Sequence, residues 1–95
     1  EYAQSGSYST KEHQTPKRIG TVERFFKKIN VAAISLDLPL SVGDTIEIRG
    51  KNTQRLKVES MQIEHKNVEA AFAGDSVGIK VPEEASEGDG VYLMP

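Results

Sequence analysis

Three short stretches of this chain repeat one pattern, Gly-Asp-x-aliphatic-x-aliphatic. They are VGDTIEI (residues 42–48), AGDSVGI (73–79) and EGDGVYL (87–93). Glycine permits the positive φ that a tight turn often needs, and aspartate can accept hydrogen bonds from backbone amides just downstream. The aliphatic residues that follow alternate with a period of two, as on a β-strand with one face in the core. The pattern therefore predicts three turns that each start a strand.

The three aspartates of this pattern could instead bind a metal ion. However, Asp44, Asp75 and Asp89 are isolated carboxylates whose wide spacing matches no calcium-binding loop. His65 is the one histidine in residues 18–95, and the chain contains no cysteine, so a zinc-type ligand set is incomplete. We therefore expect neither a metal nor a cofactor, and we interpret the aspartates as turn residues.

Short β-type runs separated by turn residues occupy the chain from residue 19 onward. The expected strands are 19–26, 31–36, 45–50, 56–64, 76–81 and 91–93. Ile46 and Ile48 of the third strand should point inward, and so should Val77, Ile79 and Val81 of the fifth. Six short strands with few helical signals predict an all-β fold, a small six-stranded antiparallel barrel of the Greek-key type.

The fourth expected strand and the stretch after it need an explanation. The apolar residues fall on even positions up to Val58 and on odd positions from Met61. A strand can keep both sets facing inward only with one extra residue, which predicts a β-bulge near Glu59 and Ser60. The stretch HKNVEAAFA (residues 65–73) then separates this strand from the next one. We expect a crossing connection there, in which Val68, Ala71 and Phe72 cover one mouth of the barrel.

The N-terminal residues differ from the rest in composition. Residues 1–17 are mostly polar and have no apolar period, which predicts a flexible tail that folding does not need. Residues 18–95 then form one small domain. No apolar run approaches the roughly 18 residues of a membrane helix, so we expect no membrane contact. We further expect a cytoplasmic monomer.

Charge is unevenly distributed along the domain. Residues 18–57 contain 8 basic and 4 acidic side chains, whereas residues 58–95 contain 2 basic and 8 acidic ones. Basic residues flank both expected hairpins, and in the first hairpin they lie beside Phe25 and Phe26. Basic and aromatic side chains together are typical of RNA-binding surfaces. The candidate RNA contacts on these hairpins are Arg24, Lys27, Lys28, Arg49, Lys51, Arg55 and Lys57. Two solvated faces of a barrel remain an alternative interpretation of the same charges.

The stretch KVESMQIEHKNVEAAFAGDSVGIKV resembles the second, β-barrel domain of the translational GTPases, the family of elongation factor Tu and its selenocysteine-specific relatives. The residues that fit the pattern in order are Val58, Ser60, Met61, Gln62, Ile63, His65, Ala73, Gly74, Asp75, Val77 and Gly78. The resemblance implies that Gln62 and His65 lie beside a pocket for the 3′ end of tRNA. Elongation factor Tu has an acidic residue where this chain has Gln62. The phosphate loop G-x-x-x-x-G-K-[ST] is missing from the sequence, so we expect no nucleotide binding.

These features together predict a non-enzymatic binding module. The resemblance implies that it binds RNA, either the tRNA acceptor end or ribosomal RNA, or a ribosome-associated protein. Ser60 and Ser76 are available as nucleophiles, but His65 alone makes no triad. Two alternatives stay open. The chain could be an accessory C-terminal barrel of a larger enzyme such as a collagenase-like peptidase, or it could be a protein–protein adaptor.

Overall fold

The computed structural model describes residues 16–95, which form ten β-strands and no helix. The strands are β2 (Lys17–Phe26), β3 (Val31–Leu36), β4 (Leu40–Ser41), β5 (Thr45–Arg49), β6 (Gln54–Lys57), β7 (Met61–Ile63), β8 (Lys66–Val68), β9 (Ala70–Ala71), β10 (Ser76–Lys80) and β11 (Gly90–Leu93). The predicted all-β class is confirmed, whereas the count of six strands is wrong. The expected tail lies outside the described residues except at its end, where Lys17 opens β2.

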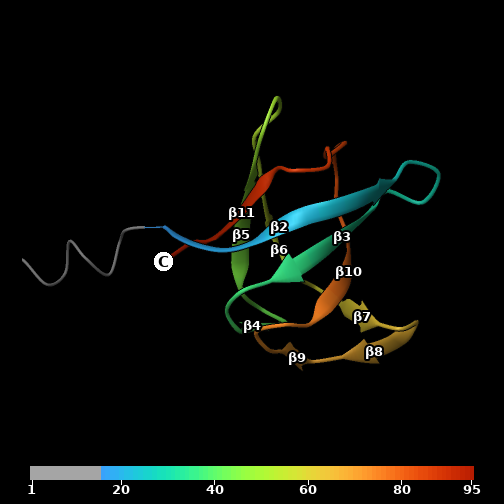
Figure 1. The fold of residues 1–95 in the computed structure, drawn as a ribbon, viewed down its shortest axis with the longest axis vertical. Coiled ribbons are helices and arrows are strands. Elements are labelled where there is room, and N and C mark those ends of the chain that lie inside the picture. The colour runs from blue at the N-terminus through green and yellow to red at the C-terminus, as the bar shows by residue number, and fades with distance from the viewer. Residues whose placement is uncertain (1–15) are drawn as a thin grey trace, which may run out of the picture.

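Eight of these strands form one antiparallel sheet in the order β6-β5-β11-β2-β3-β10-β7-β8, and β4 pairs with β9 in a second, two-stranded sheet. Figure 1 shows that the large sheet is strongly curled. Its curl follows from the connection between β6 and β7, because residues 58–60 alone join strands near opposite ends of the sheet order. A link this short requires the two ends of the sheet to approach each other. The result is a curled antiparallel half-barrel, and the predicted Greek-key topology is not confirmed.

The strand expected over residues 56–64 is in fact two strands. β6 ends at Lys57 and pairs with β5, whereas β7 begins at Met61 and pairs with β10 and β8. Val58 and Met61 are both buried, and the two residues between them are exposed. The parity change is therefore real, but it marks a crossing from one end of the sheet to the other. The predicted bulge near Glu59 and Ser60 is wrong for this reason. The register shifts instead occur in β2 and β11.

Alternating apolar residues of the strands fill the inside of the curl. The predicted inward residues Ile46, Ile48, Val77, Ile79 and Val81 are all buried. The core consists of Ile19, Val22, Ala32, Ile34, Leu36, Leu40, Ile46, Ile48, Val58, Met61, Ala71, Val77, Ile79, Val81, Ala85 and Val91. Burying one Ile, Val or Met side chain stabilises a fold by about 1.5–3 kcal/mol, so this continuous cluster holds the two ends of the sheet together.

The three Gly-Asp stretches form three turns of the same geometry. In each, the aspartate Oδ2 accepts a hydrogen bond of 2.9 Å from the amide three residues earlier, on Ser41, Phe72 or Ser86. The aspartate amide donates back to the carbonyl of that same residue over 3.0–3.1 Å. Gly43, Gly74 and Gly88 have φ of 101°, 94° and 94°, as the third residue of a type II turn requires. The turn prediction is confirmed, but the amides lie upstream of each aspartate, where we expected them downstream.

Each Gly-Asp pair also grips a buried residue of a neighbouring segment, and we call this arrangement a backbone clamp. The glycine amide donates to the carbonyl of the gripped residue, and the amide of that residue donates to the aspartate carbonyl, over 2.8–2.9 Å. The gripped residues are Val58, Leu36 and Val22 for the clamps at Asp44, Asp75 and Asp89 respectively. β5, β10 and β11 each begin directly after a clamp. The repeated sequence thus starts a strand and attaches it to a second segment.

The stretch after β7 is not a simple crossing connection. β7 and β8 form a hairpin whose turn residues Glu64 and His65 both have positive φ, 51° and 68°. The chain then pairs with β4 through β9. Ala71 is buried as expected and Val68 is half-buried, but Phe72 is 62% exposed. Phe72 therefore does not cover the barrel mouth. It is the first residue of the second Gly-Asp turn, and its side chain faces solvent.

Replacing Gly43 by Ala tests the turn geometry without a steric clash. A Cβ added at Gly43 meets no atom within 4 Å, so the cost is that of holding an L-residue at φ 101°. We expect the free energy of unfolding to fall by roughly 1–2 kcal/mol, measured by urea denaturation followed by circular dichroism. Gly43→Asn is the matched control, because asparagine tolerates positive φ, and it should cost less. An unchanged midpoint for Gly43→Ala would contradict the type II assignment.

Candidate functional site

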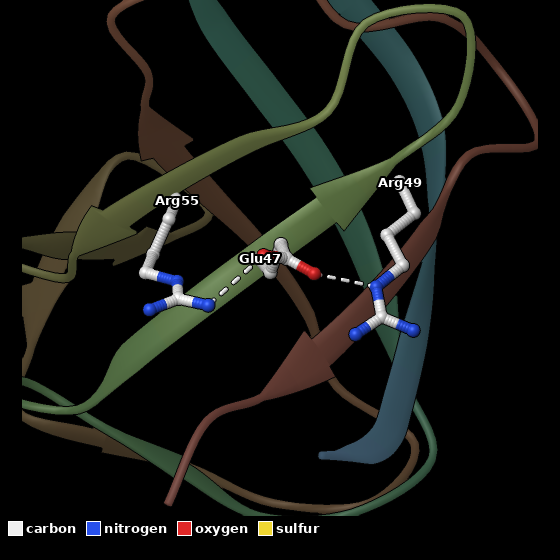
Figure 2. Close-up of polar contacts among 3 residues, drawn as sticks. All are labelled: Glu47, Arg49 and Arg55. Carbon is white, nitrogen blue, oxygen red and sulfur yellow. Dashed lines mark hydrogen bonds and ion pairs between the residues drawn. The ribbon is translucent and has the colours of Figure 1, made fainter.

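Two of the candidate RNA contacts are tied to an acidic side chain. On β5, the Nε of Arg49 lies 2.5 Å from Oε1 of Glu47, and Nη2 of Arg55, on β6, lies 3.3 Å from Oε2 (Figure 2). The Arg49 guanidinium also stacks over the ring of Tyr92 at 4.2 Å from the ring centroid. Glu47 thus offsets part of the positive charge on this face of the β5–β6 hairpin.

The carboxylate at the centre of this triad is electrostatically stabilised. The hydrogen bond from Arg49 is the largest cause that lowers the pKa of Glu47 from its ordinary value of 4.5, and the Arg55 hydrogen bond and both positive charges act in the same direction. Desolvation opposes the shift. The side chain of Glu47 is only 14% exposed, against 42% and 61% for Arg49 and Arg55. This geometry describes a structural ion-pair network on a sheet face.

The remaining basic candidates do not gather on one surface. Lys27 and Lys28 lie in the β2–β3 turn, and Lys51 lies in the β5–β6 connection. These two hairpin tips project in different directions from the sheet, as Figure 1 shows. Arg24 is exposed on β2 and Lys57 at the end of β6. The uneven charge along the sequence therefore does not become a single basic face.

Gln62 and His65 do come together, in an apolar groove on the outer face of the sheet. The groove has a volume of about 310 Å³ and is lined by Phe26, Ile29, Val31, Ala33, Gln62, Glu64, His65, Ser76, Val77 and Gly78. The side-chain amide of Gln62 donates to Oδ1 of Asn67 over 3.1 Å, and His65 stands exposed in the β7–β8 turn. The groove lies between that turn and the β2–β3 turn.

The apolar side of this groove was not predicted from the sequence. Phe25 packs on the core, whereas Phe26 is 42% exposed and Ile29 is 59% exposed. A usable signal was present in residues 31–36, VAAISL, which is apolar at nearly every position. A strand that faces water on one side alternates, whereas one covered on both sides reads as a continuous apolar run.

Two further hollows are more polar. The larger, of about 420 Å³, lies where the chain leaves β6 and where β10 ends, and its walls include Lys57, Glu59 and Lys80. The smaller, of about 250 Å³, lies beside β7 and β8 and includes Glu59, Asn67 and Glu69. The larger hollow mixes these charged residues with Leu56, Val81 and Pro82, whereas a groove lined mainly by apolar side chains lets a ligand bury more of its surface. The groove with Phe26 and Ile29 is therefore the better candidate site.

Metal and membrane features can be stated for residues 16–95. That part of the chain has no group of three or more His, Cys, Asp or Glu side chains that could hold a metal ion. The carboxylates of Asp44, Asp75 and Asp89 instead accept hydrogen bonds from backbone amides of their turns. Within the same residues no helix is long and apolar enough to cross a membrane.

Comparison with known proteins places the chain next to peptidase-like proteins. No protein-family model matches it. It is 50% identical over 78 residues to a Methanocaldococcus jannaschii protein named an uncharacterized protease, a match that covers 80% of this chain. The chain spans 19% of the length of that curated relative. The similarity is therefore confined to one part of a much longer polypeptide.

Two solved structures share the fold. Both are of the C-terminal domain of a Geobacillus thermoleovorans protein assigned as a U32 peptidase. One has a TM-score of 0.78 at 17% identity and covers 83% of this chain and 93% of that domain. The other, a selenomethionine variant, has a TM-score of 0.75 at 18% identity and covers 79% and 96%. At this identity the likeness concerns the fold.

These comparisons overturn the expected kinship with domain 2 of the translational GTPases. The relatives are peptidase-like proteins, and the assignments to translation and to RNA binding that rested on that resemblance are wrong. The structure gives the physical reason. Val58, Met61 and Val77 are core residues, and Gly74 and Asp75 form a clamp. These five matching residues meet the packing and backbone demands of a small curled sheet, so they carry no information on RNA binding.

Replacing Glu47 by Gln should change how stability depends on pH. Because the folded pKa of Glu47 lies below its ordinary value of 4.5, the charged carboxylate stabilises the fold above that value. This stabilisation is lost as the pH falls through the folded pKa. We expect wild type to unfold at higher urea than Glu47→Gln at pH 7, with a difference that shrinks on acidification below about 4.5.

A matched variant separates this network from the loss of one charge. Glu59 is exposed and takes part in no ion pair found within residues 16–95. Glu59→Gln should therefore leave the midpoint at pH 7 close to that of wild type. Equal stabilities of wild type and Glu47→Gln at every pH would show that the ion pairs of Glu47 with Arg49 and Arg55 do not stabilise the fold. Many exposed ion pairs contribute nothing measurable to stability.

Proposed function

We propose that this chain is a non-catalytic all-β module of a larger, peptidase-like protein. The observation that carries the proposal is the 50% identity over 78 residues to a protease-named protein that is about five times as long as the match. The fold likeness to the C-terminal domain of a protein assigned as a U32 peptidase supports the same assignment. Both are consistent with an accessory domain, which is the alternative that the sequence left open.

A catalytic role for this segment by itself has little chemical support. Nucleophilic catalysis needs a base within hydrogen-bond reach of the nucleophile and a third group that orients the base. His65 lies in an exposed turn and makes no side-chain hydrogen bond to any residue of 16–95. Ser76 donates to Oε1 of Glu23 over 3.0 Å, so its hydroxyl is directed to a carboxylate. Peptide hydrolysis is therefore assigned to the rest of the longer polypeptide.

The remaining role for such a module is to contact another protein surface. Its exposed large apolar side chains within residues 16–95 are Phe26, Ile29, Val42 and Phe72, and exposed apolar side chains that lie together mark contact surfaces. Two of these four line the outer groove. A contact within the same polypeptide would also explain why a protease-like protein carries a domain that performs no chemistry.

The proposal is tested by the gene and by an activity assay. The complete open reading frame should encode a peptidase-like part similar to the remainder of the M. jannaschii relative. The 95-residue chain alone should not hydrolyse fluorescently labelled casein, whereas the complete polypeptide should. Hydrolysis by the isolated chain that disappears in the His65→Ala variant would overturn the non-catalytic assignment. A reading frame without a peptidase-like part would overturn the module assignment.

A further inference from the structure

The outer groove contains β3, a strand with apolar side chains on both faces and one polar residue, Ser35, on the outer face. In β3, Ala32, Ile34 and Leu36 are buried in the core. Val31 and Ala33 point to the opposite face, where they line the groove and remain half-buried. The outside of a small curled sheet is normally polar because it faces water. An apolar outer face on a central strand indicates that something covers it.

Gly78 supports the same conclusion from the neighbouring strand. It lies inside β10, opposite Ala33, and its φ is not positive. A Cβ at this position would meet Val31 Cγ1 at 3.4 Å, an ordinary contact, so the fold has room for a side chain. At Gly20, by contrast, a Cβ would collide with the backbone oxygen of Ser35. Glycine weakens a strand interior and often marks a close approach by another group.

Both walls of the groove are formed by unusual turns. Phe26 at the end of β2 and Ile29 in the β2–β3 turn are 42% and 59% exposed. Facing them across the groove, Glu64 and His65 have positive φ in the two-residue turn of a hairpin. Turn positions with positive φ favour Asn and Gly. Conformations of this kind cost free energy in the isolated domain. The groove therefore combines exposed apolar side chains, a bare floor at Gly78 and a strained rim.

We propose that this groove docks an apolar segment with an acidic flank from the peptidase-like part of the same polypeptide. The inference rests on the proposed function. The occupant is argued from two observations. First, the chain spans 19% of its curated relative, so most of the longer polypeptide is available to supply the segment. Second, Lys27 and Lys28 lie together in the turn beside Phe26 and Ile29. They belong to neither ion pair found in residues 16–95, so their positive charges complement an acidic segment.

Hydrogen exchange of the complete polypeptide, compared with the 95-residue chain, tests the docking. Amides of residues 27–30 and 64–65 should exchange about tenfold or more slowly in the complete polypeptide, because docking restricts their opening. Phe26→Ser/Ile29→Ser should abolish that protection by removing the anchors. Gly78→Val should also abolish it by filling the groove, while leaving the unfolding midpoint of the isolated chain unchanged or higher. Lys27→Gln/Lys28→Gln should weaken protection most at low salt, where charge contacts are strongest.

Phe72→Ser is the matched control, because it removes an aromatic ring that is 62% exposed and lies outside the groove. Protection at the two turns should survive it. Equal exchange in the two forms, with a peptidase-like part present, would overturn the docking and leave the proposed function intact. A gene without that part would overturn both. Protection in the isolated chain that grows with its concentration would identify a second copy as the occupant and would likewise overturn the docking.

Discussion

The three backbone clamps are the interaction on which the rest of this structure depends. Each joins a Gly-Asp turn to a buried residue of a distant segment through two hydrogen bonds, at Val58, Leu36 and Val22. A backbone hydrogen bond contributes roughly 0.5–1.5 kcal/mol net, but its larger effect here is geometric. The clamps set where β5, β10 and β11 begin and which segments they face. The geometry of these turns and the alternation of buried apolar residues together specify the strand register of the curled sheet.

The curl creates both the core and the outer groove. Residues 58–60 join strands near opposite ends of the sheet, so the sheet is strongly curled (Figure 1). The outer face of β3 and β10 then lines the groove. The β2–β3 and β7–β8 turns rise on either side of that outer face. The groove is thus a consequence of sheet geometry, and its apolar lining is what distinguishes it from an ordinary solvated face.

Charge proved a weaker guide than packing. Glu47 lies between Arg49 and Arg55, and the lysines are spread over separate hairpin tips, so the basic half of the sequence does not form one surface. The resemblance to a translational barrel failed for a related reason. Residues that form the clamps or fill the core are required in any protein with this fold. Function depends instead on outward-facing residues, which the fold does not specify.

The sequence by itself determined the β class, the three Gly-Asp turns and the inward residues of β5 and β10, because turn chemistry and a period of two are local properties. Only the tertiary structure decided that residues 56–64 form two strands and that Phe72 is exposed. Only the structure showed that Phe26, Ile29 and Gly78 line one groove. Those outcomes depend on which ends of the sheet meet, and contacts between residues far apart in the chain leave no periodic trace in the sequence that encodes them.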